Sequence, residues 1–130
     1  MLIVQGRPEQ QSKTFVSTPK NIEIKSALTG ELLNKAILES GIFIGRSGYS
    51  TVMDLARTGK PALLIPTPGQ TEQVYLASKF RKENVFYAQN QHERNLEVGM
   101  EEAKKRTGLT GDFFDERAVA DAVSVFLAAC

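Results

Sequence analysis

The chain has 130 residues, of which 42% are hydrophobic, and this length and composition fit one globular domain with a sizeable core. Sixteen Lys and Arg against fifteen Asp and Glu give a net charge of +1, and no basic run is interleaved with aromatic residues, so nucleic acid is not favoured as a partner. No apolar run approaches the roughly 20 residues that span a bilayer, and a single cysteine (Cys130) and a single histidine (His92) exclude a disulfide framework and a Cys/His metal cluster, so we expect a soluble, cytoplasmic protein without a metal.

Short apolar runs rich in β-branched residues recur along the chain, with segments of helical spacing between them. Five runs have the length of strands, at residues 2–4, 22–24, 42–44, 62–65 and 85–87. The segments between them are long enough for crossover helices, and two more helices are expected over about 93–106 and 116–128. This alternation predicts an α/β fold: a Rossmann-like parallel sheet of about five strands with helices on both faces.

Glycines and polar residues follow three of the expected strands. Such sheets bind ligands in the crevice beyond the carboxyl ends of their strands, so these positions are the first candidates for a site. They are Gly6, residues 46–50 and residues 67–73.

The stretch "GIFIGRSGYST" places a glycine-containing turn between a strand and a helix. Free backbone N–H groups and the positive end of the helix dipole would face the crevice there, which is typical of an anion site. Gly48 would let the backbone approach a phosphate, Ser47, Ser50 and Thr51 could donate hydrogen bonds, and Arg46 could neutralise charge. Alternatively, Ser47 or Ser50 simply caps the helix, and this is the more common role of such residues.

Asp54 lies in the first turn or so of the same helix, off its apolar stripe. A carboxylate there could accept hydrogen bonds from two ribose hydroxyls, as an acidic residue does in dinucleotide-binding folds. The alternative is a capping box with Thr51 or a favourable charge near the helix N-terminus. The pattern leaves both roles open.

The stretch "IPTPGQTEQ" follows the most apolar expected strand. Its two prolines rigidify the turn, and uncharged hydrogen-bonding side chains follow at the next helix start, which suits the hydroxyls of a sugar. The alternative is an ordinary helix start with Thr71 as its cap and solvated glutamines.

The order of these motifs points to a known family. Residues 45–77, "GRSGYSTVMDLARTGKPALLIPTPGQTEQVYLA", resemble the donor-binding segment of family 28 glycosyltransferases, which include the peptidoglycan N-acetylglucosaminyltransferase and the diacylglycerol galactosyltransferases. The preceding "NIEIKSALTGELLNKAILESGIFI" fits the family's strand, helix and strand more loosely.

The resemblance implies the two-domain GT-B fold, whose carboxyl-terminal half binds a nucleotide sugar, usually UDP-linked, and whose amino-terminal half binds the acceptor. This chain resembles the carboxyl-terminal half without its first strand and helix. We therefore expect one donor-binding domain over 1–130, with strand order 2-1-3-4-5 and a position between strands 1 and 3 that is vacant or closed up. We also expect a fragment, or one chain of a two-chain enzyme whose partner carries the acceptor site and reaches the inner face of a membrane.

By the same resemblance, the enzyme inverts the anomeric carbon and needs no metal or other cofactor, its general base lies in the acceptor half, and the chain alone is inactive. The diphosphate would lie near Gly6, Arg46, Ser47, Gly48, Tyr49, Ser50 and Thr51. Asp54 would bind the ribose where the family generally has a glutamate. Gln70, Thr71, Glu72 and Gln73 would lie at the sugar, with Glu72 replacing the first of a pair of glutamines.

Two other classes of protein remain open. A UDP-sugar epimerase shares the fold, but it usually carries further acidic and histidine residues in its cleft. A signalling or nucleotide-binding module of flavodoxin-like topology needs an acidic pair after its first strand and an aspartate ending its third, whereas this chain has "QGRPEQ" and "IGRSG" there.

Overall fold

A computed structural model of the chain describes residues 1–7, 19–93 and 95–109. These residues divide into two compact units, Met1–Glu39 and the described part of Ser40–Cys130. None of the helices in the described ranges is long and apolar enough to cross a membrane. The helix expected over 116–128 lies outside the described residues.

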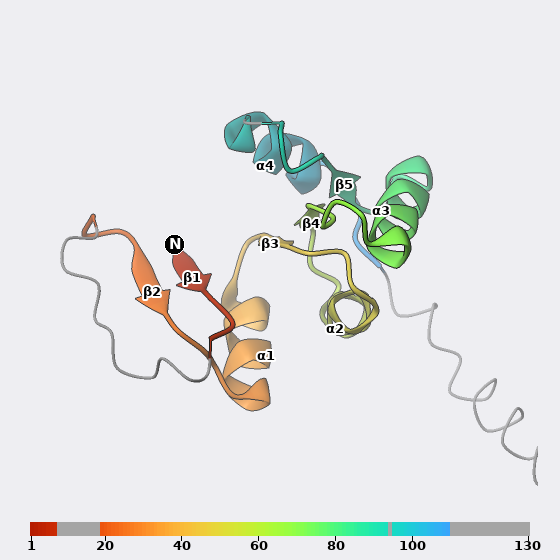
Figure 1. Cartoon of the computed structure of the whole chain (residues 1–130). Coiled ribbons are helices and arrows are strands. Elements are labelled where there is room, and N and C mark those ends of the chain that lie inside the picture. Colours follow the sequence, from red (N-terminus) through yellow and green to blue (C-terminus); the bar gives the residue numbers. More distant parts are fainter. Residues whose placement is uncertain (8–18, 94, 110–130) are drawn as a thin grey trace, which may run out of the picture. The chain divides into compact units, whose positions relative to one another are not determined.

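The first unit consists of two strands and a helix, β1 (Leu2–Val4), β2 (Glu23–Lys25) and α1 (Gly30–Glu39). β1 and β2 pair in parallel, with Ile3 opposite Ile24 (Figure 1). β2 begins one residue later than predicted because the N–H of Ile22 closes a turn onto the carbonyl of Pro19. The ladder therefore starts at Glu23, whose N–H bonds to the carbonyl of Met1.

The second unit alternates strands and helices. Its elements are β3 (Phe43–Gly45), α2 (Tyr49–Thr58), β4 (Ala62–Leu64), α3 (Thr71–Lys82), β5 (Tyr87–Ala88) and α4 (Leu96–Lys104). β4 is the central strand and pairs in parallel with both β3 and β5. The α/β class and the parallel pairing are thus confirmed, as are the neighbours 2-1, 3-4 and 4-5 of the predicted order. The predicted pairing of the first strand with the third would join the two units and stays a prediction.

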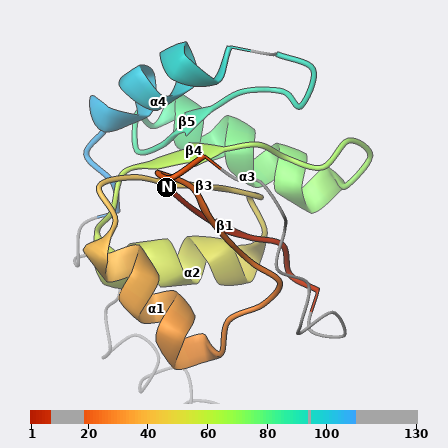
Figure 2. The same ribbon diagram turned by 90° about the vertical axis from the view of Figure 1, so that its left-hand side faces the viewer.

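Helices cover both faces of the three-stranded sheet, and β4 is buried between them. Ala62 and Leu64 point into a core with Leu55 of α2 and Phe80 of α3. Leu63, which alternates with them, faces α4, because a Cβ on Gly99 would lie 3.0 Å from its Cδ2. Figure 2 shows α2 and α4 on opposite sides of the strands. A strand buried on both faces explains the uninterrupted apolar run that predicted it.

The last strand begins two residues later than predicted. The N–H groups of Val85 and Phe86 both donate to the carbonyl of Phe80 at the end of α3, over 3.0 and 3.3 Å, so they are not available to β4. Pairing therefore starts at Tyr87, opposite Leu63. The side chains of Val85 and Phe86 are nevertheless buried, and the ring of Phe86 meets that of Phe80 edge-on at a centroid distance of 5.4 Å.

The other boundaries also follow from backbone bonds and caps. β3 starts one residue later than predicted, with the N–H of Phe43 bonded to the carbonyl of Pro61. α2 ends at Thr58, and its C-cap residue is Gly59, whose φ of 61° suits glycine and whose N–H bonds to the carbonyl of Leu55. α4 starts later than the predicted residue 93 because the side chain of Asn95 accepts the N–H of Val98 and so caps the helix, and it ends at Lys104, before the predicted residue 106.

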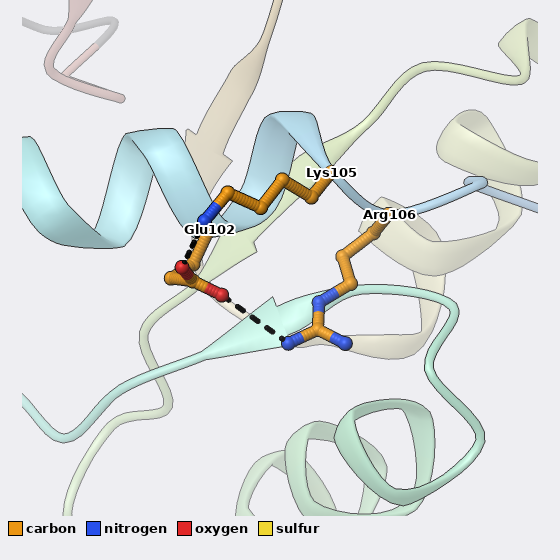
Figure 3. A network of polar contacts seen from close by, with 3 residues as sticks. All are labelled: Glu102, Lys105 and Arg106. Carbon is orange, nitrogen blue, oxygen red and sulfur yellow. Dashed lines mark hydrogen bonds and ion pairs between the residues drawn. The ribbon is translucent and has the colours of Figure 1, made fainter.

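Charged side chains meet at the end of α4, where Glu102 lies between two cations (Figure 3). Lys105 Nζ is 2.6 Å from Glu102 Oε1, and Arg106 Nη2 is 3.7 Å from Glu102 Oε2. The hydrogen bond from Lys105 and then its charge lower the pKa of Glu102, with a smaller contribution from the charge of Arg106. Glu102 in turn raises the pKa of Lys105.

Lys105→Ala should raise the pKa of Glu102 toward its ordinary value, because it removes the hydrogen bond and the nearest charge. A lowered carboxyl pKa contributes stability that is present above the ordinary pKa and is lost as the pH falls through the lowered one. NMR titration of the Glu102 carboxyl measures the shift. Lys104→Ala is the control, since Lys104 is on the same helix and makes no ion pair with Glu102. A Glu102 pKa at its ordinary value in the unaltered protein would contradict the network.

Candidate functional site

The expected site residues of the second unit lie where β3 and β4 end. Because these strands are parallel, the segments that follow them, leading into α2 and α3, leave the same edge of the sheet. We call residues 46–54 and 65–73 the strand-end cluster. Four direct contacts join its two segments, and each involves a residue that the sequence analysis selected.

Ser47 makes the shortest of these contacts. Its hydroxyl donates to the carbonyl oxygen of Gln73 over 2.7 Å, and the serine is fully buried. Gln73 lies in the first turn of α3, so one buried hydrogen bond ties the turn before α2 to the start of the next helix. Ser47 therefore acts as a connection between two helix starts.

Arg46 makes a second connection across the cluster. Its Nη1 donates to the carbonyl oxygens of Ile65 (3.0 Å) and Pro66 (3.3 Å), the two residues that follow β4. Nε and Nη2 of Arg46 have no partner among the described residues, and the side chain is exposed. The guanidinium is thus held over the turn after β4 with donors left to bind an anion.

The capping roles considered for α2 are wrong. Gly48 is the N-cap residue, and as a glycine it has no side chain that could cap the helix. Ser47 precedes the cap and bonds elsewhere, while Ser50 is already the second helical residue. Thr51 is the third, so it cannot form a capping box with Asp54.

Because its N-cap residue is a glycine, α2 begins with peptide donors that the cap residue itself does not satisfy. Among the described residues, no acceptor contacts the N–H groups of Ser50 and Thr51. The N–H of Tyr49 meets one carboxylate oxygen of Glu72, over 3.3 Å. The start of α2 therefore has the free donors and the positive dipole end that the anion-site interpretation requires.

Asp54 lies in the second turn of α2, slightly further along than expected. It is half-buried, and within the described part of the chain its carboxylate makes no hydrogen bond or ion pair. This unpaired carboxylate is free to accept hydrogen bonds from a ligand.

Gln73 is bonded into the protein more fully than the sugar-binding role suggests. Its Oε1 accepts the N–H of Thr67 over 2.9 Å, and its Nε2 donates to Oε1 of Gln70. One N–H and one lone pair of the amide remain for a ligand. Gln70 is the N-cap position of α3 but makes no capping bond through its side chain, and Thr71 is the first helical residue, so the alternative in which Thr71 caps the helix is wrong.

A hollow beside the cluster was not predicted. It has a volume of about 200 Å³ and lies along α3 at the ends of β4 and β5. Its lining includes Pro66, Val74, Arg81, Gln89 and Asn90. Gln89 is 7% exposed and comes directly after β5, so the strand-end rule that selected the other residues could have found it.

Gly6 belongs to the first unit and follows β1, from which Gln5 separates it. Its φ of 68° lies in the left-handed region, which suits glycine. The neighbouring N–H groups of Gln5 and Arg7 bond to the carbonyls of Lys25 and Ser26. Its role at a diphosphate stays a prediction. Across the described ranges no three His, Cys, Asp or Glu side chains come together as a metal site would require.

Comparison with known families connects this geometry to a function. Residues 2–106 match the model of the glycosyltransferase family 28 C-terminal domain. The chain belongs to this family. The resemblance seen in the sequence is thereby confirmed, and the chain is a donor-binding domain of the glycosyltransferase type. No curated protein and no solved structure matched the chain.

Ser47→Ala should destabilise the family 28 domain by about 1 kcal/mol, because it removes a buried hydrogen bond. Denaturant unfolding followed by circular dichroism measures the change in the free energy of unfolding. Ser50→Ala is the matched control: Ser50 is exposed, and its substitution should shift stability by less than about 0.5 kcal/mol. Equal stabilities for the two variants would show that the Ser47 bond does not hold the helix starts together.

Proposed function

We propose that the chain binds a UDP-sugar at the strand-end cluster and acts as the donor half of an inverting hexosyltransferase. One observation carries the proposal: two helix starts whose N-cap residues make no side-chain cap are held together at the carboxyl edge of a parallel sheet by the buried bond from Ser47 to Gln73. Membership of family 28 supports a sugar nucleotide as the ligand.

The diphosphate would bind at the start of α2. The free N–H groups of Ser50 and Thr51 and the positive end of the helix dipole suit a phosphate, and Gly48 leaves the approach open because nothing lies within 4 Å of its Cβ position. The free guanidinium donors of Arg46 add a positive charge on the same side of the cluster. We assign Tyr49 to the same subsite through its backbone N–H.

The two ends of the donor would bind on either side of the diphosphate. The unpaired carboxylate of Asp54 would accept hydrogen bonds from the ribose hydroxyls. Gln70 and Thr71 are exposed at the start of α3 and would bind the sugar, together with the unused N–H of the Gln73 amide.

In the reaction, an acceptor hydroxyl attacks the anomeric carbon as the bond from that carbon to the diphosphate oxygen breaks. The bonding electrons leave with the diphosphate, and the N–H groups of α2 and Arg46 stabilise the growing negative charge. The acceptor proton passes to a general base in an acceptor domain or a partner chain. Any contact with a membrane would be made by that acceptor domain or partner chain. The chain by itself would bind the donor without turning it over.

Titration with UDP should perturb the backbone amide NMR signals of residues 46–54 and 70–73, because the diphosphate and sugar subsites lie there. Signals from α4, on the opposite face of the sheet from α2, serve as the internal control. If millimolar concentrations of a panel of nucleotides leave the cluster's signals unchanged, the donor site lies elsewhere or does not form.

Asp54→Ala should weaken UDP binding by roughly tenfold or more, since it removes charge-assisted hydrogen bonds to the ribose. It should leave the free energy of unfolding nearly unchanged, because the carboxylate has no partner among the described residues. Calorimetric titration and denaturant unfolding measure the two effects, and Asp54→Glu, which keeps the charge, should retain binding. Comparable losses of binding and stability in Asp54→Ala would assign Asp54 a structural role instead.

A further inference from the structure

One carboxylate lies at the position where the proposed function requires a phosphate. Oε1 of Glu72 is 3.3 Å from the backbone nitrogen of Tyr49, the first residue of α2. Of the side chains in the described residues, it is the one that accepts a hydrogen bond from the start of this helix. A negative charge there interacts favourably with the helix dipole, as the charge of a phosphate would.

The backbone around Glu72 is fixed by its neighbour. Gln73 receives the buried hydroxyl of Ser47 on its carbonyl oxygen and the N–H of Thr67 on its side chain. These bonds set the first turn of α3 against the start of α2 and bring the carboxylate of Glu72 to the N–H of Tyr49. The side chain itself is exposed and can swing away at little cost.

We propose that Glu72 is an internal competitor of the diphosphate and so determines how tightly the site holds its donor. The inference rests on the proposed function. A bound diphosphate must displace the carboxylate from the N–H of Tyr49, and it is then repelled by the negative charge of the carboxylate nearby. Both effects lower the affinity of the site for the diphosphate. In the reverse direction, the carboxylate returns to Tyr49 as the spent nucleoside diphosphate leaves, and this favours product release.

Glu72→Gln tests the proposal, with inorganic pyrophosphate as the probe because it carries the diphosphate charge without base or sugar. The substitution keeps the size of the side chain and removes its charge. Pyrophosphate should bind about fivefold more tightly to the variant, the factor expected for a charge at an exposed helix terminus. The amide signals of residues 49–51 report the binding by NMR. Glu97→Gln is the matched control, since Glu97 is also exposed in the first turn of a helix, α4, and should leave the affinity unchanged.

Equal pyrophosphate affinities for the unaltered protein and Glu72→Gln would overturn the proposal. So would an equal gain in pyrophosphate affinity with Glu97→Gln, or amide signals of residues 49–51 that pyrophosphate leaves unperturbed in both the unaltered protein and Glu72→Gln. A parallel titration with UDP separates this outcome from failure of the proposed function. Tighter pyrophosphate binding by Glu72→Gln without UDP binding would retain the role of Glu72 and refute the nucleotide donor. UDP binding with no effect of the substitution on either ligand would retain the donor and refute the competitor.

Discussion

A single buried hydroxyl determines the geometry of the strand-end cluster. Ser47 follows β3 and Gln73 opens α3, and the bond between them joins two turns that leave the same edge of the sheet. The other contacts between the segments, from Arg46 to the carbonyls after β4 and from Glu72 to the start of α2, span the same gap. The positions of the proposed phosphate, ribose and sugar groups relative to one another thus depend on the packing of two helix starts.

Hydrophobic patterning predicted most of the fold because buried strands and helices have a recognisable pattern of apolar residues in the sequence. β4 is an unbroken apolar run, and α2 shows the helical spacing of Val52, Leu55 and Ala56, all buried. The errors fall at boundaries, which are set by local hydrogen bonds of the backbone and, at the start of α4, by the side-chain cap of Asn95. Val85 and Phe86 are apolar and buried like strand residues, but their N–H groups belong to the end of α3.

The sequence predicted the positions of the site residues better than it predicted the role of each residue. The rule that ligands bind beyond the carboxyl ends of parallel strands selected both segments of the cluster. Capping could not be judged from sequence, because Ser47 and Thr71 are the residue types that cap helices, and only the structure shows that Gly48 and Gln70 hold the cap positions. The bonds from Gln73 to Thr67 and Gln70 also depend on how one loop folds back on itself.

The adjacent residues Glu72 and Gln73 differ in how much sequence change they can accept. Gln73 is tied to the loop before it through its side chain and to Ser47 through its carbonyl, so a replacement would disturb the turn itself. Glu72 is exposed, and within the described ranges its flexible side chain makes one hydrogen bond, with the N–H of Tyr49. During evolution this position could exchange charge or hydrogen-bonding character without unfolding the domain. A scaffold that fixes one residue and leaves its neighbour free can vary donor affinity in single substitutions.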